Sequence, residues 1–122
     1  MTDSVDRIVD DYCRCWRQMD AAERKALLAS VCADDVTYTD PTVALTGLDA
    51  FAAHIDKTMA GRPGGQIVRT TANDQHHGFL RFGWHLRQGD GGTGVPGIDI
   101  VTFSPDGRLA TILGFFGPLQ PL

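Results

Sequence analysis

Apolar residues near the start of the chain recur every three or four positions, which is the period of an amphipathic helix. This pattern predicts a helix over residues 4–19. Asp20 and Glu23 have the spacing of a capping box, in which two side chains satisfy backbone N–H groups of the first helical turn. A second helix is therefore predicted from Asp20 to about Cys32.

The segment VTYTDP, residues 36–41, alternates like a short strand and places Asp40 directly before a proline. After it, Thr46 and Asp49 repeat the capping pattern and predict a third helix, LDAFAAHIDKTMA. Gly61 follows this helix, and glycine is the most common residue just past the end of a helix.

From residue 66 onward the hydrophobic period switches to two, as expected for strands. Four strands are predicted: QIVRTTAND, GFLRFGWHLRQ, GIDIVTF and RLATILGFF. The connections NDQHHG, GDGGTGVPG and SPDGR are rich in turn-forming residues. Three helices followed by a run of antiparallel strands predict an α+β fold, and residues 1–122 are predicted to form a single domain.

The last two predicted strands are apolar on both faces. In GIDIVTF, one face carries Asp99, Val101 and Phe103, and the other carries Ile98, Ile100 and Thr102. One face can pack on the helices, but no further sequence is left to cover the other. Because a second subunit is the simplest cover, the outer residues Ile98, Ile100 and Ile112 predict a homodimer.

The composition narrows the class of protein. Of the 122 residues, 43% are hydrophobic, which is enough for one core, and the net charge is -4. A weakly acidic chain with dispersed basic residues predicts no nucleic-acid partner and no membrane partner. The N-terminus has no signal-peptide pattern, and the three cysteines have no framework spacing, so we expect a cytoplasmic protein with reduced thiols.

Motifs for cofactors and metals are weak. Residues 92–97, GTGVPG, have the letters of a dinucleotide fingerprint, but a strand rather than a helix is predicted after them. The four histidines lack the spacing of a zinc pair, and no cysteine or serine has a nucleophile motif. We therefore expect neither a cofactor nor a metal.

Two aspartates are the strongest candidates for chemistry. Asp99 lies among apolar neighbours, where a carboxylate stays protonated or acquires a partner, so it is either a functional group or half of a structural ion pair. Asp40 either begins an ordinary Asp-Pro turn or places a charge at the mouth of a pocket.

Four segments carry a family resemblance: the first helix, ADDVTYTDP, TGLDAFAAHI, and GIDIVTFSPDGRLATILGFFG. Together they resemble the SnoaL-like branch of the NTF2-like superfamily, which contains ketosteroid isomerases, polyketide cyclases, epoxide hydrolases, dehydratases and proteins of unknown activity. The resemblance covers nearly the whole chain. It implies a cone in which three N-terminal helices pack on a strongly curved antiparallel sheet and enclose a pocket, and it implies homodimers through the outer sheet face.

The resemblance also implies roles for individual residues. Asp40 matches the general base of the isomerases, and Tyr12 and Asp99 match the two groups that stabilise an oxyanion. The residues implied to line the cavity are His54, Phe82, Trp84, Val101 and Phe116. Trp84 stands where a smaller residue leaves room for a steroid, so the implied substrate is a small apolar carbonyl compound.

Several functions remain open at this stage. The first is a cofactor-independent enzyme that transfers a proton next to a carbonyl group, as an isomerase or a cyclase does. The second is a protein that binds an apolar ligand without converting it, and the third is a dimerising scaffold. An epoxide hydrolase requires an arginine between two aspartates, and Arg81 is the nearest candidate. A raised pKa of Asp99 favours an oxyanion site, whereas an arginine paired with Asp99 favours a structural role.

Overall fold

The computed structural model describes the backbone of residues 2–122 and the side chains of residues 4–122. Its helices are α1 (Thr2–Arg14), α2 (Ala21–Val31) and α3 (Leu48–Ala60). The predicted first helix is too long, because the chain turns after Arg14 and the backbone N–H groups of Cys15 and Trp16 bond back three residues. This turn places the Trp16 ring beside the core instead of on a helix.

The two predicted helix starts have different outcomes. The prediction for α2 is confirmed, because the Asp20 side chain accepts a hydrogen bond of 2.8 Å from the backbone N–H of Glu23. For α3 the predicted range is confirmed, but the predicted capping by Thr46 is wrong. Thr46 is the last residue of a strand, β2 (Val43–Thr46), and Gly47 caps α3 with a φ of 95°, which a residue with a side chain rarely adopts.

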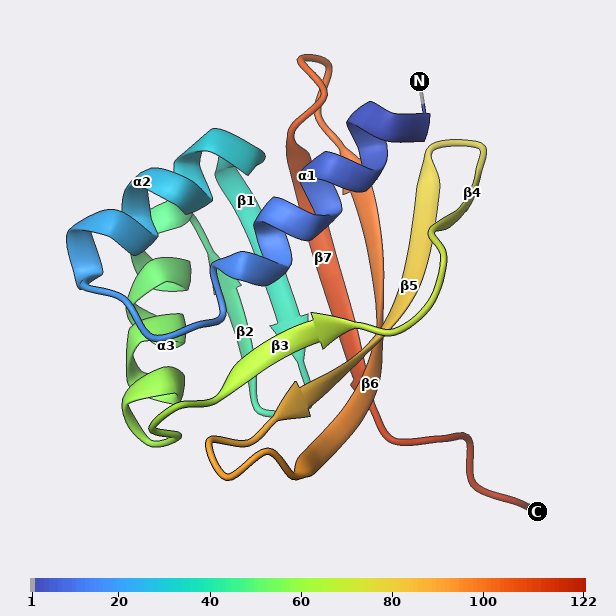
Figure 1. Cartoon of the computed structure of the whole chain (residues 1–122). Coiled ribbons are helices and arrows are strands. Elements are labelled where there is room, and N and C mark those ends of the chain that lie inside the picture. The colour runs from blue at the N-terminus through green and yellow to red at the C-terminus, as the bar shows by residue number, and fades with distance from the viewer. Residues whose placement is uncertain (1) are drawn as a thin grey trace.

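The strands form one sheet in the order β2-β1-β7-β6-β5-β3, and β4 pairs with β5 (Figure 1). The remaining strands are β1 (Cys32–Asp40), β3 (Gln66–Arg69), β4 (Asp74–His76), β5 (Phe79–Arg87), β6 (Thr93–Phe103) and β7 (Leu109–Phe116). The α+β prediction is confirmed, with one difference in pairing: β1 runs parallel to β7, and the other neighbours are antiparallel. The β6 strand begins before the predicted boundary, so GTGVPG belongs largely to a strand and not to a turn.

The sheet curves around the helices, as Figure 1 shows, with α1 near β3 and α3 against β1 and β2. Its concave face and the helices enclose the apolar core, which includes Val9, Leu28, Phe51, Ile55 and Leu80. Among the described residues, no helix is long and apolar enough to cross a membrane.

The two faces of β6 are as predicted, but the prediction for Ile112 is wrong. Ile112 pairs with the buried Val101 and is 1% exposed, so its side chain lies on the concave face in the core. The next residue, Leu113, takes the outer position beside Ile100. Exposed apolar side chains of this outer face include Ile98, Leu113 and Phe115.

Candidate active site

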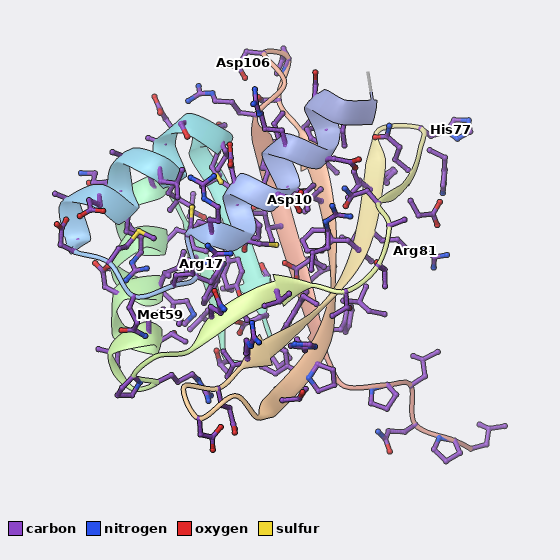
Figure 2. All side chains as sticks on the ribbon, in the orientation of Figure 1. Asp10, Arg17, Met59, His77, Arg81 and Asp106 are labelled. Carbon is purple, nitrogen blue, oxygen red and sulfur yellow. The ribbon has the colours of Figure 1, made fainter. Side chains whose placement is uncertain are left out.

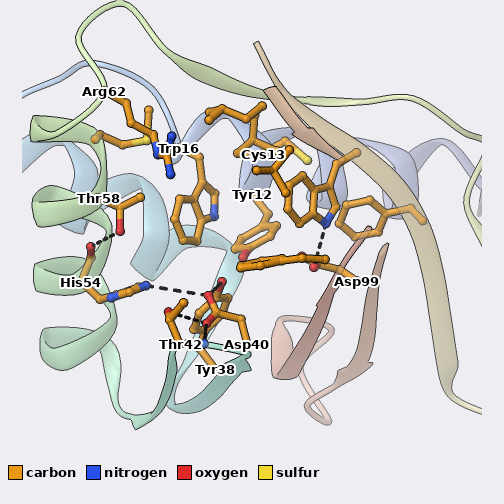
Figure 3. Close-up of a pocket in the computed structure, with 17 residues that line it drawn as sticks. Tyr12, Cys13, Trp16, Tyr38, Asp40, Thr42, His54, Thr58, Arg62 and Asp99 are labelled. Atoms are coloured by element: carbon orange, nitrogen blue, oxygen red, sulfur yellow. Dashed lines mark hydrogen bonds and ion pairs between the residues drawn. The ribbon is translucent and has the colours of Figure 1, made fainter. Parts of the chain in front are cut away.

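A pocket of about 210 Å³ opens on the concave side of the sheet, between the helices and the ends of the strands (Figure 3). Aromatic rings make up much of its wall: Tyr12, Trp16, Tyr38, Phe82, Trp84 and Phe116. Its volume is below the roughly 300–1,000 Å³ that is typical of pockets for drug-sized ligands. The pocket therefore suits a ligand of one or two rings better than a steroid.

The sheet register explains how residues far apart in the sequence come together. Phe82 of β5 pairs with Asp99 of β6, and Asp99 pairs with Gly114 of β7. A Cβ atom added to Gly114 would lie 2.9 Å from Asp99 Oδ1 and 3.6 Å from Asp40 Cβ. Gly114 thus separates the two carboxyl groups, and both of them reach the same pocket.

Asp40 ends β1 with a side chain that is only 4% exposed but well supplied with donors. The Tyr38 hydroxyl donates to Oδ2 at 2.6 Å. The Thr42 hydroxyl and N–H donate to Oδ1 at 2.7 Å each, and the Val43 N–H donates at 3.2 Å. Burial alone would raise the pKa of Asp40, but these donors outweigh burial and the net effect lowers its pKa. Asp40 is therefore a carboxylate at neutral pH.

Asp99 has the opposite environment. Asp99 is 6% exposed. The Trp84 indole N–H donates a hydrogen bond of 2.9 Å to its Oδ1 atom. Burial raises the pKa of Asp99 to about 7, the indole N–H partly opposes this, and the negative charge of Asp40 adds to it. A large share of Asp99 is therefore protonated near neutral pH, and because Oδ1 accepts from Trp84, the proton on Oδ2 is left for a ligand.

The Trp84 ring reaches Asp99 because its cross-strand neighbour has no side chain. Gly97 pairs with Trp84, and a Cβ atom at Gly97 would overlap the indole. The ring therefore lies across the backbone of β6, where its edge also meets Phe116 at a centroid distance of 5.9 Å. Trp84 both narrows the pocket and orients the Asp99 carboxyl group.

Tyr12 projects from α1 into the pocket, and in the view of Figure 3 its hydroxyl points toward the space between Asp40 and Asp99. This hydroxyl is buried and has no hydrogen-bond partner within the described part of the chain. Burial raises the pKa of Tyr12, and the nearby Asp99 raises it further. The Trp16 indole opposes this slightly without reaching hydrogen-bond geometry. Tyr12 is thus a protonated donor that a ligand oxygen can satisfy.

His54 of α3 also lines the pocket. Its Nε2 atom is 3.9 Å from Asp40 Oδ2, and its ring packs against Trp16 and Tyr38. Burial lowers the pKa of His54, while Asp40 partly opposes this effect. His54 is therefore a mainly neutral imidazole at neutral pH.

The pocket includes most of the residues predicted from the sequence: Tyr12, Asp40, His54, Phe82, Trp84, Asp99 and Phe116. Val101 is an exception, because it is completely buried under the helices and does not line the pocket. Arg81, the arginine considered for an epoxide hydrolase, lies on the side of the sheet away from the helices and pairs with Asp74 at 2.9 Å (Figure 2). The Asp-Arg-Asp arrangement is therefore not formed by Arg81.

Sequence reasoning missed ten of the residues that line the pocket, and at least two of these had a detectable signal. Tyr38 shares the inner face of β1 with Asp40, as the two-residue alternation indicates. Trp16 was assigned to a helix, although its aromatic side chain marked it as a core residue. Arg62, in the connection after α3, had no pattern that distinguished it from other surface arginines. Within residues 4–122, no group of three or more His, Cys, Asp or Glu side chains is placed to hold a metal ion.

Comparison with known proteins agrees with this fold. The profile of the SnoaL-like domain matches residues 9–112. A candidate isomerase of the SnoaL-like family from Agrobacterium tumefaciens is 29% identical, with a TM-score of 0.85 over 92% of this chain and 96% of that one. An NTF2-like protein of unknown function from Exiguobacterium sp. is 15% identical, with a TM-score of 0.73 over 92% and 99% of the two chains.

A third similar structure is a candidate SnoaL-like polyketide cyclase from Jannaschia sp., which is 14% identical, with a TM-score of 0.66 over 89% of this chain and 84% of that one. No curated protein matches the chain significantly. At these lower identities the likeness concerns the fold alone, whereas the domain profile covers most of the chain. The chain therefore belongs to the SnoaL-like family.

Proposed function

We propose that the pocket binds a small, mainly apolar carbonyl compound and transfers a proton next to its carbonyl group, as an isomerase or a cyclase does. The observation that carries this proposal is the buried Tyr12 hydroxyl, which has no partner among the described residues and lies near a carboxyl group whose pKa is raised. Two protonated donors in an apolar pocket suit an oxygen that becomes negative during a reaction.

Asp40 supplies the third part of this proposal. As a carboxylate facing the same pocket, it accepts a proton from the carbon next to the carbonyl group, and the electron pair moves onto the oxygen. Tyr12 and Asp99 donate hydrogen bonds to that oxygen. Asp40 then returns the proton to another carbon of the same molecule, so that no cofactor or second substrate is consumed.

A second candidate is a binding protein without turnover, and the hydrogen bonds to Asp40 favour it. Four donors stabilise the carboxylate form and lower its pKa, which makes Asp40 a weak base. The scaffold function is the third candidate, and it requires no ligand.

The first experiment is a thermal-shift screen of enones, polyketide fragments and terpenoids. A ligand that binds the native state raises the midpoint of unfolding, by the equivalent of about 2.7 kcal/mol at a concentration of 100 Kd. We expect enones to raise the midpoint in the wild type and less so in Tyr12→Phe. Conversion of a bound enone then separates an enzyme from a binder. If no carbonyl compound raises the midpoint, the proposed function is wrong.

We also propose a homodimer formed through the outer face of β6 and β7. This face exposes Ile98, Leu113 and Phe115, with exposed fractions of 45%, 38% and 55%, and a second copy can bury them in a self-complementary contact. Light scattering at micromolar concentration tests the proposal. We expect a dimer in the wild type and in the loop variant Gln88→Glu, and a monomer in Leu113→Asp. A monomeric wild type would contradict it.

A further inference from the structure

One cation at the rim of the pocket takes no part in the proposed proton transfer. Arg62 lines the pocket, and it is the lining residue with a permanent positive charge. Its guanidinium forms no ion pair and no hydrogen bond with other side chains in the described part of the chain. Most of the other arginines form an ion pair with an aspartate: Arg14, Arg24, Arg69, Arg81 and Arg108. Arg62 therefore differs from them in having its charge available to a ligand.

The main chain holds Arg62 at a defined place, although its side chain is exposed. Its N–H donates to the Met59 carbonyl at 3.1 Å, and its own carbonyl accepts from Gly65 at 2.9 Å. The Gln18 side chain donates to the same carbonyl at 2.8 Å. In Figure 3 the guanidinium lies beside Trp16, at the other side of the pocket from Asp99. An anchored backbone with a free side chain suits a residue that binds the far end of a ligand.

The charges of the pocket indicate what that end of the ligand is. The protonated donors Tyr12 and Asp99 suit a carbonyl oxygen at one side of the pocket, and the guanidinium suits an anion at the other. A guanidinium matches a carboxylate with two parallel hydrogen bonds. Among the described residues that line the pocket, Arg62 is joined by no other arginine or lysine and His54 is mainly neutral, so a single negative charge fits better than a phosphate.

We infer that the substrate is an apolar carbonyl compound that also carries a carboxylate, which Arg62 binds at the rim while the carbonyl oxygen lies at Tyr12 and Asp99. This inference rests on the proposed function, because it uses the same pocket and the same position of the carbonyl group. It adds that the pocket prefers an anionic ligand to a neutral ligand of the same shape.

The test uses two probes that differ only in the carboxylate: 2-naphthol and 6-hydroxy-2-naphthoate. The naphthol oxygen imitates an enolate oxygen, and the two-ring body agrees with a small pocket. Dissociation constants are measured by calorimetry at pH 7 and low salt for the wild type, Arg62→Gln and Arg62→Lys. The control variant is Arg17→Gln, because Arg17 is also exposed but lines a separate surface groove.

In the wild type we expect the carboxylate to tighten binding by about fivefold, a modest factor because solvent screens an exposed charge. Arg62→Gln should abolish this preference and leave the affinity for 2-naphthol unchanged within about twofold, whereas Arg62→Lys should keep part of the preference. Arg17→Gln should behave like the wild type. Added salt should reduce the preference in the wild type.

Three outcomes would overturn the inference. Equal binding of the two probes by the wild type would show that the pocket does not select an anion, while the proposed function would remain. An equal loss of affinity for both probes in Arg62→Gln would show that Arg62 acts by packing. If neither probe binds the wild type, the proposed function and this inference are both wrong.

Discussion

Asp40 and Asp99 lie on the same face of one sheet, separated by a single glycine, and yet their pKa values are shifted in opposite directions. Asp40 stands at the end of a strand, where the following turn supplies backbone and hydroxyl donors. Asp99 stands in the middle of a strand whose backbone groups are already paired within the sheet, and it receives one indole N–H. The position in the strand decides how many donors a carboxyl group can receive.

This difference provides the pocket with both an acid and a base at neutral pH from a single type of side chain. The charge of Asp40 further raises the pKa of Asp99, so the two groups reinforce each other's states.

The largest effect is expected from a substitution of Asp40. Asp40→Asn cannot accept the proton, so turnover of a substrate found in the enone screen should fall by about a thousandfold, within the range for loss of a general base. Binding should be retained. Initial rates and dissociation constants for the variant and for Asp99→Asn separate these effects, and Asp99→Asn should retain more activity. Wild-type turnover by Asp40→Asn would show that Asp40 is not the base.

Asp99 should dominate the dependence of the unfolding free energy on pH. Because its folded pKa of about 7 lies above its ordinary value of 3.8, the native state keeps a proton that the unfolded chain has lost. The contribution of Asp99 is fully present below about pH 3.8 and is lost as the pH rises through about 7. In urea unfolding, the difference in unfolding free energy between wild type and Asp99→Asn should change by up to about 4 kcal/mol across this range.

The contribution of Asp40 to stability should depend on pH with the opposite sign. Its lowered pKa stabilises the fold above the unfolded pKa, and this contribution is lost as the pH falls through the folded pKa. Asp40→Asn should therefore weaken the loss of stability in acid, and it should move the change near pH 7 to lower pH, because the charge of Asp40 contributes to the raised pKa of Asp99. A wild type and an Asp99→Asn variant with parallel pH profiles would contradict the raised pKa of Asp99.

Tyr12 lies between Asp40 and Asp99, and a change at Tyr12 should affect ligand binding without a comparable effect on stability. Tyr12→Phe removes a buried hydroxyl without a partner, so the unfolding free energy should stay within about 1 kcal/mol of the wild type or rise. Binding of 2-naphthol should weaken by about tenfold, which corresponds to one hydrogen bond. Calorimetry and urea unfolding measure the two quantities. Unchanged binding together with a large loss of stability would assign Tyr12 to the core alone.

The smallest expected effect tests why the pKa of Asp40 is lowered. Thr42→Val removes the hydroxyl donor that lies 2.7 Å from Oδ1 and preserves the shape of the side chain. The pKa of Asp40 should rise only slightly, because the backbone donors and Tyr38 remain. NMR titration of the Asp40 carboxyl carbon measures this shift. Thr39→Val, on the outer face of the same strand, is the control.

Much of the fold was predictable from the sequence because hydrophobic period and turn residues act locally. The second and third helices and the long strands β5, β6 and β7 were located in this way. The failures have physical causes. The apolar period continues past Arg14 because Trp16 enters the core from a turn, and β2 is a short strand whose only signal is its pairing with β1.

The site was predictable only in part, since its residues meet through the sheet register. Asp99 could be identified from its apolar neighbours and Asp40 from its place at the end of a strand before a proline, whereas Tyr12 and His54 came from the family resemblance. The donors to Asp40 and the role of Gly97 depend on pairings between strands that no local pattern reports. The resemblance placed Val101 at the cavity, but Val101 shares only the strand face of Asp99 and not the pocket: farther along β6 the same face is covered by the core.

Gly114 has a consequence for how this pocket can change over generations. Any side chain at this position would press on the carboxyl group of Asp99 before it narrowed the space beside Asp40. A mutation of Gly114 would therefore change both the size of the cavity floor and the pKa of Asp99. A descendant that adapts to a smaller molecule by filling this position would also have to retune its acid, so selection for a tighter fit is directed to the rim instead.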